Sequence, residues 1–127
     1  MNQKTFDKLI LKSNKLLNMF EHNGRKHFSF IMDGRHIMSY GINNIRKTHT
    51  IAAKAFKYPF LHSEVKSVIN FNYPPRFLRG LAMVNIRLSN SGEVLLAKPC
   101  TACQNFLEAF RLKAVWYSTN GQNFSRL

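Results

Sequence analysis

The chain has 127 residues, of which 45% are hydrophobic and 13% aromatic. This length and composition exclude an intrinsically disordered protein and leave room for one hydrophobic core, so we expect a single domain over residues 1–127. Its 19 Lys and Arg residues stand against six Asp and Glu residues, a formal net charge of +13. Because such an excess attracts polyanions, we expect a nucleic acid or a nucleotide as the partner.

Membrane and export signals are not expected. No apolar run approaches the ~20 residues that a membrane-spanning helix requires. The first segment, MNQKTFDKLILKSNKLLNMF, has lysines throughout and no apolar block, unlike a secretory signal peptide. We therefore expect a cytoplasmic protein with reduced thiols and no membrane contact.

Residues ~4–20 are predicted to form a basic amphipathic helix. Apolar side chains recur at helical spacing, namely Phe6, Leu9, Ile10, Leu16, Leu17 and Phe20. Lys4, Lys8, Lys12 and Lys15 follow one another at helical steps and line another face. A stripe of this kind is more often a solvated face than a binding site, and we expect it to be solvated.

The next segment, HFSFIMDGRHIMSYG, alternates about Asp33-Gly34 and predicts two strands joined by a tight turn. A loop rich in Thr, Asn and Lys, GINNIRKTHT, follows it. Residues ~61–71 suit a helix that ends before YPPR. Residues ~80–89 suit a buried strand, and residues ~93–97 suit another strand after the turn NSG.

A third helix is predicted to begin at the cysteines, over residues ~100–111, and a last strand over residues ~113–119. The order is helix, strand, strand, helix, strand, strand, helix, strand. It predicts an α/β fold, a three-layer α/β/α sandwich with a central mixed sheet of about five strands. Trp116 lies in the last strand, and we expect it to pack in the core.

Both cysteines of the chain, Cys100 and Cys103, stand together in PCTAC. Two thiolates are half of a tetrahedral zinc site, and the remaining ligands must be histidine or carboxylate. His62 and Glu64 stand at the start of the other central helix and are the candidates. Three protein ligands and one open position are typical of a catalytic zinc. At a helix start we also expect the helix dipole to lower the pKa of both thiols.

Two other interpretations of the cysteines stay open. A Cys-x-x-Cys pair in a cytosolic α/β protein can be a redox pair, although His62 and Glu64 at a matching helix start favour the metal site. A structural zinc would need a fourth protein ligand, for which His49 is the candidate nearby.

Together, His62-x-Glu64 and Pro99-Cys100-x-x-Cys103 resemble the signature of the cytidine deaminase superfamily, H-x-E…P-C-x-x-C. The resemblance covers about residues 26–120. It implies Zn²⁺ held by the histidine and the two cysteines, and a catalytic Glu64 that moves protons while water attacks C4 of cytosine or C6 of adenine. Where the family commonly has alanine between His and Glu, this chain has Ser63.

The resemblance also bears on the substrate. Gly41-x-Asn43 is similar to the family's strand-end Gly-x-Asn, whose asparagine contacts the substrate sugar; a turn cap is the equal alternative for Asn43. The branch that acts on adenosine in tRNA commonly has methionine before the second cysteine. Here that residue is Ala102, which favours cytosine.

Three functions remain open. The first is deamination of cytosine in a nucleic-acid strand, with single-stranded DNA favoured because basic residues extend from Lys4 to Arg126. The second is deamination of free cytidine, deoxycytidine or their monophosphates, which the small size of the chain resembles. The third is a non-catalytic zinc domain that binds nucleic acid. In the first case we expect Arg46, Lys47 and then Lys98 to bind phosphates.

Overall fold

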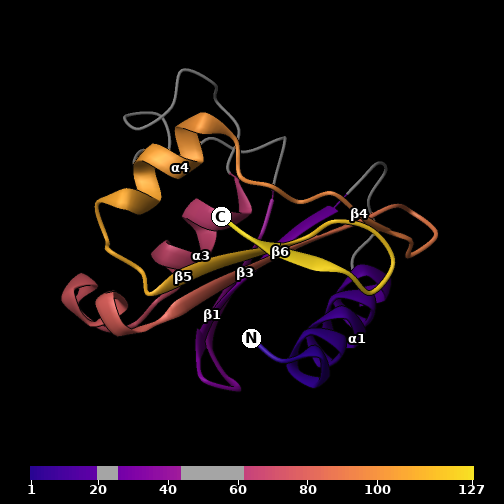
Figure 1. The fold of residues 1–127 in the computed structure, drawn as a ribbon, viewed down its shortest axis with the longest axis horizontal. Helices are drawn as coiled ribbons and strands as arrows, with labels where there is room; N and C mark the ends of the chain where they lie inside the picture. The colour runs from indigo at the N-terminus through magenta and orange to yellow at the C-terminus, as the bar shows by residue number, and fades with distance from the viewer. Residues whose placement is uncertain (20–25, 44–61) are drawn as a thin grey trace.

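A mixed sheet of six strands, with helices on both faces, forms the frame of the described residues, 1–19, 26–43 and 62–127, in this computed structural model. The main strand order is β2-β1-β3-β5-β6, and β4 pairs with β3 beside this path. Figure 1 shows α1 (Gln3–Met19) on one side of the sheet and α4 (Thr101–Glu108) on the other. The predicted three-layer α/β/α arrangement is confirmed.

The strands begin with a hairpin of β1 (Lys26–Asp33) and β2 (His36–Ile42), which turns at Gly34 with φ +58°. β1 pairs antiparallel with β3 (Ala82–Leu88), which in turn pairs parallel with β5 (Ala114–Ser118). The remaining elements are α3 (Ser63–Ile69), the 3₁₀ helix η1 (Pro75–Gly80), β4 (Val94–Leu95) and β6 (Phe124–Arg126).

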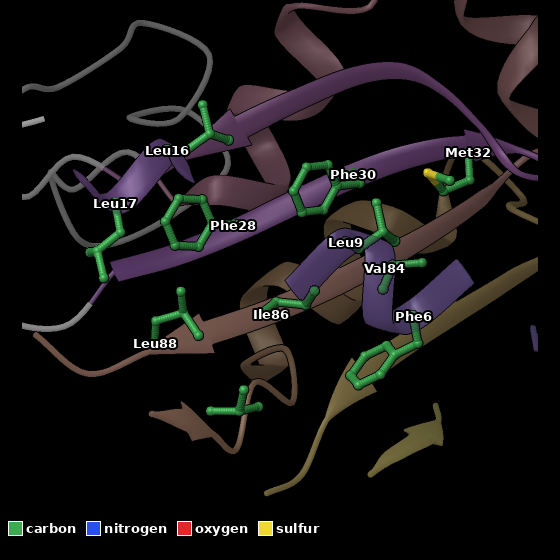
Figure 2. Packing of buried hydrophobic residues seen from close by; sticks show 11 residues of the cluster. Phe6, Leu9, Leu16, Leu17, Phe28, Phe30, Met32, Val84, Ile86 and Leu88 are labelled. Carbon is green, nitrogen blue, oxygen red and sulfur yellow. The ribbon is translucent and has the colours of Figure 1, made fainter. Parts of the chain in front are cut away.

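One face of the sheet packs against α1. Alternate residues of a strand point to the same side, so the apolar positions of β1 and β3 form a continuous surface. Figure 2 shows the rings of Phe28 and Phe30 and the side chains of Val84 and Ile86 in one cluster with Phe6, Leu9, Leu16 and Leu17 of α1. All members of this cluster are buried, and Trp116 packs against it as predicted.

The other face of the sheet packs against α3 and α4. Ile31 and Met83 lie on this side, in a cluster that includes Leu107 of α4. Two residues along each strand, and so on the same face, lie the polar residues Ser29 and Asn85, and both are buried. This polar interruption of the core lies beneath the start of α3, where the candidate site begins.

The ends of the elements differ from the sequence prediction. The helix expected over 100–111 ends at Glu108, because the chain leaves the helical conformation before Arg111, whose φ is +51°. The helix expected over 61–71 and the strand expected over 93–97 are also shorter. The sixth strand, β6, was not predicted, because three residues after the turn at Gly121 are too few to show an alternating pattern.

None of the helices within the described ranges is both long and apolar enough to cross a membrane.

Candidate metal centre

The starts of two helices meet on the α3 and α4 side of the sheet. His62 is the N-cap of α3 and Cys100 is the N-cap of α4, and both have extended backbones. The helices touch through a small buried cluster that includes Val65 and Cys103. Their meeting brings His62 Nδ1 to 3.4 Å from Cys103 Sγ and 4.0 Å from Cys100 Sγ.

The three side chains fit a zinc ion in geometry and in donor type. Their ligand atoms lie within 4.8 Å of one another, the single such group of His, Cys, Asp and Glu in the part of the chain that the structure describes. Tetrahedral zinc with ordinary bond lengths would place nitrogen and sulfur about 3.6 Å apart and two sulfurs about 3.8 Å apart. Two thiols and one imidazole are also donors that zinc prefers. The predicted group of His62, Cys100 and Cys103 is therefore brought together.

The acidity of Cys103 differs from the prediction. The side chain is fully buried, and burial raises the pKa of its thiol far above the ordinary value, with the negative charges of Glu64 and Cys100 adding to the rise. The expected lowering by the helix start is wrong for Cys103, because the cost of burying a thiolate exceeds what the first turn of a short helix returns. A bound cation would supply the missing positive charge, since thiols that ligate metals are deprotonated.

Glu64 is buried beside this group, with 7% of its surface exposed. Its two carboxylate oxygens accept hydrogen bonds from Ser63 Oγ at 3.1 Å and from Asn85 Nδ2 at 3.4 Å. The negative charge of this carboxylate adds to the rise in the pKa of the Cys103 thiol. Glu64 is thus held in one orientation next to the candidate ligands.

Ser29 closes these contacts into a ring of four side chains. Its hydroxyl donates to Asn85 Oδ1 at 2.7 Å and lies 2.8 Å from Ser63 Oγ. Ser29 and Asn85 are directly opposite each other in the β1–β3 ladder, and both are buried. Sequence reasoning missed both residues. The available signal was a polar residue at the inward position of each of two neighbouring apolar strands.

The strand β2 supports α3 from below. Gly41 has no side chain, and a Cβ there would lie 2.7 Å from Lys66 Cβ and closer still to the backbone of Ser63 and Ser67. Ser39 Oγ also donates to the carbonyl oxygen of Ser67 at 2.8 Å. Glycine is therefore required at position 41 so that the helix carrying His62 and Glu64 can lie directly on the strand.

The predicted substrate-binding residues are only partly described. Asn43 extends the hairpin, because its N–H donates to the His27 carbonyl at 3.1 Å and its Oδ1 accepts from the His27 N–H at 2.9 Å. Its contact with a sugar stays a prediction. Lys98 is exposed two residues before Cys100. Arg46 and Lys47 lie outside the described residues, as does His49, the candidate fourth ligand of a structural zinc.

No protein-family model matches this chain, and no curated protein matches it either. What the chain does must therefore be inferred from the residues and geometry of the site itself.

Proposed function

We propose that the chain is a zinc-dependent hydrolytic deaminase of the cytidine deaminase superfamily that converts cytosine to uracil. The observation that carries the proposal is the meeting of His62, Cys100 and Cys103 at two helix starts, with the buried Glu64 in the first turn of the helix that His62 caps. These residues are the ones that the superfamily signature requires, in the same order and at the same spacing.

The roles of the residues follow from their chemistry. His62, Cys100 and Cys103 would hold the metal, and a zinc ion bound by three protein ligands makes a water molecule acidic enough to react near neutral pH. Glu64 takes a proton from the attacking water and delivers protons to the ring nitrogen and to the departing amino group. Water adds at C4, the bond from C4 to the exocyclic nitrogen breaks, and ammonia leaves. The reaction therefore consumes one water molecule for each ammonia released.

We propose a nucleic-acid strand as the substrate, with single-stranded DNA first. The support is the net charge of +13, which exceeds what a single nucleotide phosphate needs. Exposed Lys98, beside Cys100, is suited to bind a phosphate next to the reacting base. A base in a single strand can enter a pocket without the cost of breaking a base pair.

A substrate panel tests this proposal. The zinc-loaded chain is incubated with cytidine, deoxycytidine, dCMP, and single- and double-stranded DNA and RNA, and uracil formation is measured by mass spectrometry. We expect conversion of cytosine in single-stranded DNA above all. If the chain converts free deoxycytidine or dCMP efficiently and leaves the cytosines of the oligonucleotides unconverted, the substrate is a free nucleoside or nucleotide and not a strand. If the zinc-loaded chain binds oligonucleotides and converts no cytosine in any substrate, the remaining function is a non-catalytic zinc domain that binds nucleic acid.

A further inference from the structure

A basic hollow lies between α1 and the β1–β2 hairpin, away from the metal centre. It has a volume of about 420 Å³. The helix contributes Lys8, Lys12 and Lys15, and the turn of the hairpin contributes Arg35 and His36. None of the described residues that line it is acidic. A concave surface of one charge sign concentrates ions of the opposite sign.

A second hollow, of about 640 Å³, adjoins the first and shares Arg35 with it. It adds Lys113 and Arg126, and its described lining has a single acidic residue, Asp33. The six Lys and Arg side chains of the two hollows are all exposed. We call this surface the basic band, made of Lys8, Lys12, Lys15, Arg35, Lys113 and Arg126.

The shape of the basic band suits a chain of phosphates. Lys8, Lys12 and Lys15 follow one another at about 4.5–6 Å along the helix axis, so they form a regular row of cations. A flexible strand with regularly spaced phosphates can follow such a row into a hollow. A flat membrane surface would instead require a flat or convex basic face.

The basic band and the metal centre lie on different faces of the sheet. α1 packs against the face of Phe28 and Phe30, whereas α3 and α4 cover the face of Ile31. Figure 1 shows the same separation between α1 and α4. Nucleotides in the basic band are therefore not those whose bases reach Glu64.

We propose that the basic band binds the phosphate backbone of a single-stranded nucleic acid, as a site separate from the metal centre. The lysines of α1 then form a binding surface, where the sequence alone favoured a solvated face. The proposal does not depend on deamination, because nothing in the basic band takes part in that chemistry.

The test uses a fluorescein-labelled oligothymidylate of about 20 nucleotides, longer than typical single-strand sites. This probe has no cytosine, so its binding is independent of the reaction. Fluorescence anisotropy gives the dissociation constant of the zinc-loaded, 127-residue chain between about 50 and 200 mM salt. The band variant carries Lys8→Gln, Lys12→Gln and Lys15→Gln, which keep a good helix-forming residue at each position. The matched control carries Arg76→Gln, Arg79→Gln and Arg111→Gln, which remove the same charge from exposed residues that lie outside the band and outside α1.

Each lost phosphate contact should lower the log–log salt slope by about 0.7, so the band variant should lose about 2 from its slope. Between about 50 and 200 mM salt, the dissociation constant of the band variant should therefore rise by a factor about 16 times smaller than the factor for the unchanged chain. The control should keep the original slope. A second variant, Arg35→Gln with Lys113→Gln, removes contacts outside α1 and should lose about 1.4.

Equal slopes for the band variant and its control would overturn the proposal. The proposal would also be overturned if the unchanged chain did not bind the oligonucleotide, or if it bound phosphatidylserine vesicles and not the oligonucleotide. If the oligonucleotide results hold and no cytosine is converted, the basic band stands and the proposed reaction fails.

Discussion

Burial raises the pKa of the Cys103 thiol, whereas a bound metal ion would lower it. Its side chain is fully buried, and that burial, with the charges of Glu64 and Cys100, raises the pKa of the thiol. Without metal, the folded chain keeps Cys103 protonated, whereas the unfolded chain releases this proton above the ordinary thiol pKa of 9.0. A bound metal removes the conflict, because it requires the thiolate.

The free energy of unfolding of the metal-free chain should therefore fall as pH rises above 9.0. Above that pH the unfolded state binds fewer protons than the folded state, so the contribution of this one group falls by about 1.4 kcal/mol per pH unit. Urea unfolding in the presence of a chelator, from about pH 8 to 10.5, measures it. Cys103→Ala, which lacks the thiol, should show a shallower dependence by this amount. If the free energy of unfolding had the same pH dependence in both proteins, the Cys103 thiol would not be the group that causes the fall.

Asn85 connects the sheet to Glu64. Its replacement tests whether it orients the Glu64 carboxylate or only stabilises the fold. Asn85→Leu removes the donor to Glu64 and places an apolar side chain beside this buried carboxylate, while Ser29 Oγ exchanges its Asn85 acceptor for Ser63 Oγ, and the loss at Glu64 should cost about 1–3 kcal/mol of stability. In the folded, zinc-loaded variant we expect kcat to fall while KM stays near its original value, because Glu64 loses its orientation and substrate contacts do not change. Steady-state kinetics and urea unfolding measure the two effects.

Asn105→Leu is the matched control, because Asn105 is exposed on α4. It should change neither quantity. If Asn85→Leu loses stability but keeps kcat, Asn85 has only a structural role.

Sequence reasoning found the candidate ligands because a metal site requires particular residue types at particular spacings. Cys100 and Cys103 are the two cysteines of the chain, and few other residue types complete a zinc site with them. Ser29 and Asn85 have no such signal, because a single serine or asparagine in a strand is compatible with many environments. Their role depends on the pairing of β1 with β3, which local sequence does not encode.

Among the elements, the contact of β2 with α3 determines where His62 and Glu64 lie. Gly41→Ala would place a methyl group against the backbone of Ser63 and Ser67. We expect a loss of about 1–3 kcal/mol in stability from this overpacking, together with weaker zinc binding as α3 is displaced. Urea unfolding and competition with a chelator of known zinc affinity measure these effects.

Gly80→Ala provides the comparison, because a Cβ at Gly80 meets nothing within 4 Å. Equal stability and equal zinc affinity in the two alanine variants would show that α3 does not depend on the close approach at Gly41.

The elements whose ends sequence reasoning predicted most closely are those with a sustained period. Residues 3–19 keep an apolar stripe over several turns, and the hairpin alternates on both sides of Asp33-Gly34. The β4 strand has only two residues, because the chain turns to bond with β5 instead, where the Ala97 N–H donates to the Ser118 carbonyl. Where tertiary contacts set the ends of a short element, as in β4, or its existence, as in β6, the local sequence does not show them.

At the scale of the whole molecule, charge and chemistry are separated. The net charge of +13 predicts a polyanionic partner, and composition alone does not show where that partner binds. The fold provides two surfaces, the candidate metal centre where α3 and α4 begin and the basic band beside α1 and the hairpin. A nucleic-acid strand that occupied both surfaces would be bound at two places, one at the candidate metal centre and one at the basic band on the other face of the sheet.

The central claim is that Glu64 moves the protons for cytosine deamination beside a zinc ion held by His62, Cys100 and Cys103. The most direct measurement compares the unchanged chain with Glu64→Gln on a single-stranded oligonucleotide that contains one cytosine. Zinc content is determined for both proteins, and uracil is quantified by mass spectrometry. Glu108→Gln, which changes an exposed carboxylate on α4, is the matched control.

We predict one zinc ion per chain in all three proteins. Uracil should form at similar rates in the unchanged chain and in Glu108→Gln, and at a rate lower by at least about 10²–10⁴-fold in Glu64→Gln. Turnover by Glu64→Gln at the rate of the unchanged chain, with zinc fully bound in both, would contradict the account.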